Sequence, residues 1–137
     1  MGDAVYEFTV ELDAPMPDAE ASVRESLRVE GFGVLTEIDV QAVLQSKLQE
    51  PFRPYRILGA CNPGLAHRAL QAEPGVGVFL PCNVVVEEAG EGRTRVRFME
   101  PTAALNLIEN DTLRAVAEDA STRLHRVADS LRSGSRA

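Results

Sequence analysis

The stretch DTLRAVAEDASTRLHRVADSL, residues 111–131, decides the fold. Apolar side chains recur in it at steps of three and four, which is the pattern of a helix with one buried stripe: Leu113, Val116, Ala117, Ala120, Leu124, Val127, Ala128 and Leu131. Asp111 can serve as the N-cap, so the helix is predicted to begin there. The leucines and valines of the stripe each contribute about 1.5–3 kcal/mol on burial, which favours a helix lying across a sheet.

Runs of β-type residues around this helix supply the strands of such a sheet. In residues 93–99 the alternation places Arg93, Arg95 and Arg97 on one face, with Thr94, Val96 and Phe98 on the other. Gly90 and Gly92 predict a hairpin before that strand. Four further strands are predicted, at residues 6–12, 32–40, 55–60 and 76–88, the last bent around Pro81 because proline cannot donate a ladder hydrogen bond.

Three shorter helices are predicted between the strands, at residues 17–30, 40–50 and 63–71. Gly31 ends the first, Lys47 borders the apolar side of the second, and Asn62 followed by Pro63 is the capping signature of the third. The pattern predicts an α+β fold of the order β-α-β(4)-α, an antiparallel sheet with helices packed on one face. Residues 1–132 form a single domain in this interpretation, and residues 133–137 a disordered tail.

Composition excludes several classes of protein. The chain has 137 residues, of which 45% are hydrophobic and 26% charged, the balance of one globular domain. A net charge of −7 argues against nucleic-acid binding, which needs a basic surface. Apolar runs are far shorter than a membrane span of roughly 18–20 residues, and the N-terminal residues lack a signal-like pattern. We therefore expect a soluble protein of the cytoplasm, with no membrane partner.

The succession PYRILGACNP at residues 54–63, Ala66 and Ala69 in the helix after it, and FLPCNV at residues 79–84 resemble the bacterial "domain of unknown function 302" family. The likeness extends over nearly the whole chain, from the first strand and helix through the turn at residues 30–32 and Lys47 to both cysteine motifs. This resemblance implies a fold similar to the TATA-binding-protein-like α+β class, without DNA binding, and suggests homodimers. It implies no activity, so no catalytic residue is carried over.

The two cysteine motifs are the first candidate site. Cys61 precedes Asn62 and Pro63, and Cys82 lies between Pro81 and Asn83, each where a strand ends or bends. Paired strands would bring these motifs to one pocket. Each thiol can be a small buried residue. Alternatively, the start of the following helix lowers the pKa of Cys61 and makes it a nucleophile, or the two thiols together hold a soft metal ion or a redox partner.

Other polar residues offer weaker candidates. The helix start after Asn62 could bind an anion with help from Lys47 or Arg56. His67 could face the Cys61 region as a ligand, although a lone histidine in a helix is more often a surface or packed residue. Strand-end and last-helix carboxylates are interpreted as solvated charges: Glu87, Glu88, Glu91, Glu109, Asp111, Glu118 and Asp119. The arginine face of residues 93–97 predicts cross-strand ion pairs or, alternatively, a subunit interface.

These patterns leave three hypotheses open. The first is a domain that binds a small ligand or ion near the Cys-Asn-Pro and Pro-Cys-Asn motifs without catalysis, the cofactor being unidentified. The second is a thiol-dependent enzyme or redox sensor in which Cys61 attacks and Cys82 resolves. The third is a non-catalytic dimeric interaction module. Zinc-ligand spacings, nucleophile triads and phosphate-binding loops do not occur in the sequence, and no metal ligands are assigned.

Overall fold

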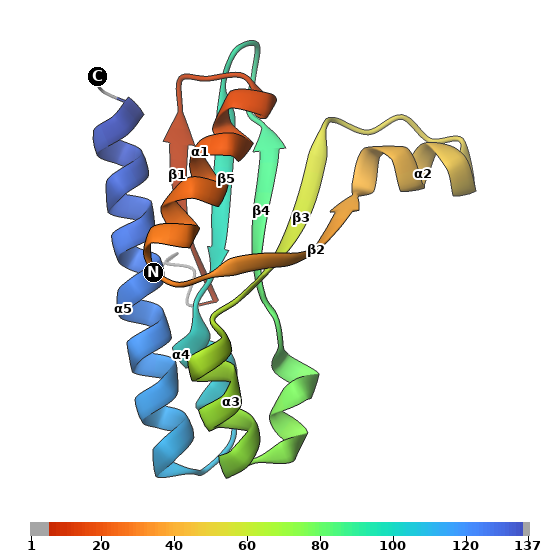
Figure 1. The fold of residues 1–137 in the computed structure, drawn as a ribbon. Coiled ribbons are helices and arrows are strands. Elements are labelled where there is room, and N and C mark those ends of the chain that lie inside the picture. The colour runs from red at the N-terminus through yellow and green to blue at the C-terminus, as the bar shows by residue number, and fades with distance from the viewer. Residues whose placement is uncertain (1–5, 136–137) are drawn as a thin grey trace, which may run out of the picture.

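Five antiparallel strands form one sheet in the computed structural model, which describes residues 6–135 (Figure 1). The strand order is β1-β5-β4-β3-β2, and the antiparallel pairing agrees with the predicted α+β fold. The elements in chain order are β1 (Glu7–Leu12), α1 (Met16–Val29), β2 (Gly33–Asp39), α2 (Val40–Leu48), β3 (Tyr55–Cys61), α3 (Pro63–Ala72), the 3-10 helix η1 (Pro74–Phe79), β4 (Cys82–Glu88), β5 (Thr94–Met99), α4 (Pro101–Leu105) and α5 (Asp111–Ser135). Within residues 6–135, no helix has the length and apolar character to cross a membrane.

Helices α1 and α5 cover one face of the sheet. The eight residues of the predicted α5 stripe are all buried, and α1 contributes Ala19, Val23 and Leu27 to the same interior. The α1 residues and the second half of the α5 stripe pack against strand residues such as Val84 and Phe98. The prediction that helices pack on one face of an antiparallel sheet is therefore confirmed for these two helices.

Helix α5 joins two apolar clusters. Its second half, from Leu124 to Leu131, packs on the sheet and α1. Its first half, from Leu113 to Ala120, packs instead against α3, η1 and α4, below the sheet in Figure 1. Because α3 follows β3 directly, this second cluster lies where the cysteine motifs are.

The other face of the sheet, which we call the open face, carries charged side chains. Thr94, Val96 and Phe98 point to the core, so the arginines between them point to the open face. Arg95 Nε lies 2.6 Å from Glu11 Oε2, and Arg97 Nη1 lies 3.0 Å from Glu7 Oε2. The predicted cross-strand ion pairs are confirmed. Gly90 and Gly92 have φ values of 123° and 72° in the turn that precedes β5, as the hairpin prediction requires.

The prediction of a strand beginning at residue 76 is wrong. Residues 74–79 form η1, and β4 begins only at Cys82, after a cis peptide bond between Leu80 and Pro81. The Glu73 carboxylate accepts a hydrogen bond from the Gly75 amide at 3.3 Å and so starts the turn. Val76 is fully buried in the second cluster. Packing on α3 thus overrides the β propensity of this run.

The two ends of α5 and the short helix before it also differ from the predictions. Asn110, not Asp111, caps α5, since Asn110 Oδ1 accepts a hydrogen bond from the Leu113 amide at 3.1 Å. Helix α5 continues to Ser135, so the first residues of the expected tail are helical, and residues 136–137 lie outside the described residues. Helix α4 was not predicted; the Glu100 side chain caps it by accepting from Thr102.

Helix α2 forms where it was predicted but does not pack as an amphipathic helix should. None of its residues is buried, and Val43 and Leu48 are among the exposed hydrophobic residues. Together with the edge strand β2 it projects from the body of the molecule, toward the right in Figure 1. We call β2 and α2 together the arm (residues 33–48). Its apolar side chains lack a covering layer within the described part of the chain.

Candidate functional site

The two cysteine motifs lie side by side at the end of the β3-β4 pair. These strands are antiparallel and place Ala60 opposite Cys82, so the end of one motif meets the start of the other. Contact between the motifs is tight at Gly59, where a Cβ atom would lie only 2.8 Å from Cγ of Pro81. The convergence expected from the sequence is therefore present in the fold.

Beside the motifs lies a cavity of about 270 Å³, which we call the apolar cavity. Its walls come from the end of β3, the start of β4, α3, α4 and α5. The main lining residues are Phe32, Leu35, Ala60, Cys61, Leu65, Ala66, Ala69, Leu70, Leu80, Pro81, Cys82, Leu105, Val116 and Ala120. None of these side chains carries a charge, so the cavity suits an apolar occupant.

Asn62 also borders the apolar cavity, but its side chain is already engaged. Its Oδ1 accepts a hydrogen bond from the Leu65 amide at 3.2 Å, and its Nδ2 donates to the Glu30 carbonyl at 3.4 Å. The first contact is the predicted cap of α3, and the second ties α3 to the turn after α1. Gly31 in that turn has φ 88°, as expected for a residue that ends a helix. Asn62 therefore positions the cavity wall rather than a ligand.

Both thiols line the apolar cavity and both are made less acidic by it. Burial raises the pKa of Cys61. Burial, together with the nearby Cys61, raises the pKa of Cys82 to about 11. Of the two alternatives that the sequence left open for Cys61, a thiol made more acidic by the start of α3 or a small buried residue, the raised pKa favours the second. Both sulfurs are thus neutral thiols at pH 7, a poor state for a nucleophile or a metal ligand.

We expect the free energy of unfolding to fall between about pH 9 and pH 11 because of Cys82. In this window the unfolded chain releases the thiol proton, whereas the folded chain holds it until about pH 11. Stability from the raised pKa is therefore complete below the unfolded value and decreases by about 2–3 kcal/mol across the window. Urea unfolding of the wild type and of Cys82→Ala at stepped pH measures the difference; parallel curves would contradict the prediction.

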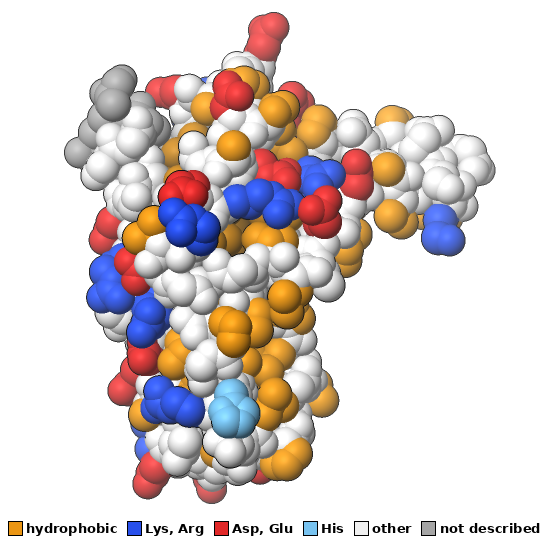
Figure 2. Space-filling view, viewed as in Figure 1, with side chains coloured by type: hydrophobic (Ala, Val, Ile, Leu, Met, Phe, Trp, Pro, Cys, Tyr) orange, Lys and Arg blue, Asp and Glu red, His pale blue; other side chains and the backbone are white. Residues whose placement is uncertain are grey.

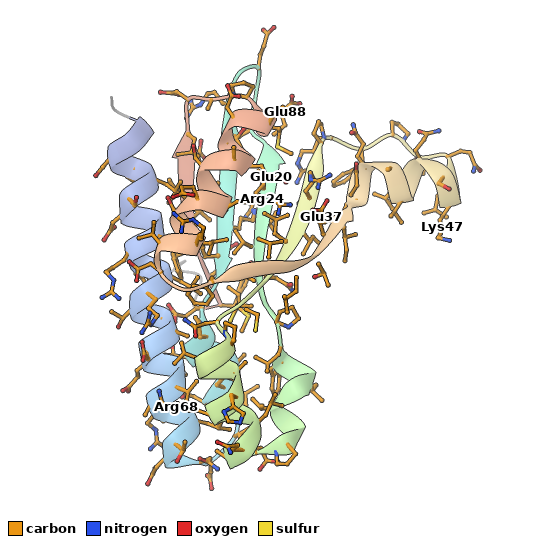
Figure 3. The ribbon with its side chains drawn as sticks, in the orientation of Figure 1. Glu20, Arg24, Glu37, Lys47, Arg68 and Glu88 are labelled. Atoms are coloured by element: carbon orange, nitrogen blue, oxygen red, sulfur yellow. The ribbon has the colours of Figure 1, made fainter. Side chains whose placement is uncertain are left out.

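The remaining candidate residues lie elsewhere. Lys47 is at the outer end of the arm, far from α3, as Figure 3 shows. Arg56 turns to α1, with Nε 2.7 Å from Glu20 Oε1, so neither residue assists an anion at the start of α3. His67 is exposed on α3 and does not line the apolar cavity. Asn83 points to the open face. Within residues 6–135 there is no group of three or more His, Cys, Asp or Glu residues that could hold a metal ion.

The sequence and the fold are both similar to those of known proteins. The family model described as "Domain of unknown function DUF302" matches residues 8–131. The chain belongs to this family. A solved structure, that of an uncharacterised conserved DUF302 protein from Bacillus stearothermophilus, is 35% identical, with a TM-score of 0.85 over 94% of this chain and 100% of that chain. No curated protein matches the chain.

One residue of this DUF302 domain departs from its sequence interpretation. Glu87 was expected to be a solvated charge, yet its side chain is only 1% exposed. Its carboxylate accepts hydrogen bonds from Nε of Arg53, at 2.9 Å, and from Nε of Arg97. Strand alternation across the hairpin places Glu87 and Arg97 on one face and could have indicated their contact. Arg53 comes from the loop after α2, whose course the sequence pattern does not determine.

Proposed function

We propose that this DUF302 domain is a non-enzymatic binding protein whose ligand is a small, predominantly apolar molecule held in the apolar cavity. The observation that carries the proposal is the cavity of about 270 Å³ between both cysteine motifs, without a charged lining residue. An apolar cavity of about 150 Å³ is enough to take up benzene or xenon, so this larger cavity has room for such a molecule. A molecule of one or two rings, or a short branched chain, matches this volume.

The rim of the apolar cavity supports the same ligand class. Leu35 is 69% exposed and Leu70 42% exposed, and both line the cavity. Figure 2 shows hydrophobic side chains gathered over α3 and η1 on this side of the molecule, apart from the charged cluster over α1 and β2. Hydrophobic side chains clustered around an opening are typical of a site that receives an apolar partner.

Neutral thiols fit this proposal better than they fit thiol chemistry. A redox sensor or a thiol enzyme needs a thiolate, and the pKa values of Cys61 and Cys82 are shifted away from that state. A soft metal ion would have to displace both protons. As thiols, the two sulfurs offer the ligand a polarisable apolar wall.

The test uses indole as a neutral probe and Cys61 as the reporter inside the apolar cavity. Bound indole should slow the alkylation of Cys61 by iodoacetamide, a reaction that mass spectrometry measures. It should also raise the melting temperature of the protein. Ala66→Phe, which fills the cavity, should remove both effects. Ala115→Phe, on the exposed side of α5, is the matched control and should retain them. Unchanged alkylation at saturating indole, or equal loss in both variants, would overturn the proposal.

A second candidate, a homodimer formed through the arm, is favoured by a separate observation. Helix α2 has nine residues and none is buried, whereas isolated helices of that length are marginal in water. Strand β2 pairs with β3 on one side only, and its outer edge has no partner strand within residues 6–135. Leu35 and Ile38 of this edge strand are exposed, a surface that proteins usually cover. A second copy pairing through β2 would cover the arms of both protomers.

Sedimentation velocity over a range of protein concentrations tests the dimer. The expected result is a dimer in the wild type and a shift to monomer in Leu48→Asp. Leu107→Asp, at an exposed leucine outside the arm, is the control and should leave the dimer intact. A wild type that stays monomeric at every concentration would exclude this candidate.

A further inference from the structure

The open face contains a second hollow, of about 560 Å³, which neither cysteine motif borders with its thiol. We call it the open-face groove. It lies over β1, β4 and β5, beside α4 and the loop before β3. Its polar lining includes Tyr6, Glu7, Arg53, Tyr55, Glu87 and Arg97. None of these residues belongs to the apolar cavity.

The floor of the open-face groove is a carboxylate clamped by two arginines. Glu87 Oε2 lies 2.9 Å from Nε and 2.8 Å from Nη2 of Arg53, and Oε1 accepts from Nε of Arg97. These hydrogen bonds keep the pKa of Glu87 below its ordinary value although burial opposes them. A buried carboxylate thus holds two guanidinium groups at one place.

Both guanidinium groups are also fixed from their other sides. Arg97 Nη1 donates to Glu7 at 3.0 and 3.2 Å. Arg53 lies over the rings of Phe52 and Tyr55, 4.7 and 5.6 Å from their centroids. Such contacts reduce the side-chain entropy that a ligand would otherwise have to overcome. The two cations are therefore preorganised before any ligand arrives.

In the open-face groove the two arginine side chains are more exposed to solvent than the carboxylates that pair with them. Side chains of Arg53 and Arg97 are 47% and 30% exposed, while Glu87 is 1% and Glu7 15% exposed. Glu100 at the far end accepts hydrogen bonds from Thr102 and contacts His125. Within residues 6–135, Nη1 of Arg53 and Nη2 of Arg97 have no hydrogen-bond acceptor. The N–H groups of these two nitrogens are therefore free to donate hydrogen bonds to an anion.

We propose that the open-face groove binds a small organic monocarboxylate. Its carboxylate would accept hydrogen bonds from Arg53 Nη1 and Arg97 Nη2, and its apolar body would lie along the groove, whose lining includes Tyr6 and Tyr55. Planar guanidinium groups match the geometry of a carboxylate, and charge-assisted hydrogen bonds of this kind are roughly twice as strong as neutral ones. The carboxylates beneath the arginines repel a multiply charged anion more strongly than a monoanion, so a single negative charge is favoured.

Benzoate is the probe. Its binding to the full chain is measured at constant ionic strength by ¹⁵N NMR of the arginine Nε–H groups. Nε–H signals of Arg53 and Arg97 should shift together and saturate. Benzyl alcohol, which lacks the charge, should not shift them. Arg53→Gln should weaken binding by about tenfold or more. Arg93→Gln is the matched control, because Arg93 pairs with Glu11 and Asp13 outside the groove.

Arg53 is the preferred site of substitution because it lies in an exposed loop, so its variant is expected to fold even if an Arg97 variant does not. The absence of saturation with benzoate would overturn the proposal. So would an equal loss of affinity in Arg93→Gln, an equal shift with benzyl alcohol, or tighter binding of inorganic phosphate. Binding that persists in Ala66→Phe separates this site from the apolar cavity, so the two proposals can fail independently.

Discussion

Replacing Glu87 by alanine lowers the free energy of unfolding by about 3 kcal/mol at neutral pH, as expected when one partner of a buried ion pair is removed. The loss is large because the carboxylate compensates two arginines that otherwise lie close together on the open face. Both arginines remain partly exposed, so water takes over some of the lost hydrogen bonds and keeps the effect below that of a fully buried charge. Urea unfolding measures it directly.

Glu88→Ala is the matched control, since Glu88 is the next residue of β4, points to solvent near the hairpin in Figure 3 and has an exposed side chain. It should change stability by less than about 0.5 kcal/mol. Equal effects of the two substitutions would contradict the burial of the Glu87 carboxylate between Arg53 and Arg97.

The contribution of Glu87 also has a defined pH dependence. Its folded pKa is lowered, so the stabilisation is fully present above the unfolded value of about 4.3 and is lost as the pH falls through the folded value. The difference in stability between the wild type and Glu87→Gln should therefore shrink in acid. A difference that stays constant down to about pH 2 would contradict this assignment.

Gly59→Ala is the second substitution for which we expect a large loss, of about 2–3 kcal/mol. The added Cβ would lie 2.2 Å from Oγ1 of Thr36 and 2.8 Å from Cγ of Pro81. The threonine hydroxyl can rotate away, but the proline ring cannot. Pro81 would be displaced from β3, and the wall of the apolar cavity with it. The melting temperature should be lower than that of the wild type, and indole binding should be weaker.

A double-mutant cycle with Thr36→Ala separates the two contacts of the new methyl group. Removing the hydroxyl relieves only the contact with β2, so the double variant should recover part of the stability and none of the indole binding. Full recovery of both would show that Pro81 does not restrict the site. Wild-type stability of the single variant would contradict the close packing of the two motifs.

Much of the fold was predictable because its main elements have strong periodic patterns. The stripe of α5 and the alternation in β5 reflect burial on one side only, which is a local signal. The cap of α3 by Asn62 was also predicted, since its chemistry depends on neighbouring residues alone. These features placed both cysteine motifs at the end of adjacent strands.

Features that depend on distant contacts were not predictable in this way. Residues 74–79 have β-type composition, but burial of Val76 against α3 makes them a 3-10 helix. Burial of Glu87 requires Arg53, which reaches it from a loop 34 residues earlier in the chain. The pKa of Cys61 depends on how many atoms surround it, and a helix start in the sequence does not report that. In each case tertiary packing outweighs a local tendency.

The most direct test of the proposed function is a crystal structure of the protein under xenon pressure, because xenon occupies apolar cavities and has strong electron density. We expect a xenon atom in the apolar cavity, in contact with Cys61, Ala66 and Cys82, and its absence from Ala66→Phe crystals. A cavity filled by ordered, hydrogen-bonded water molecules, with no xenon at this position, would contradict the assignment of an apolar ligand.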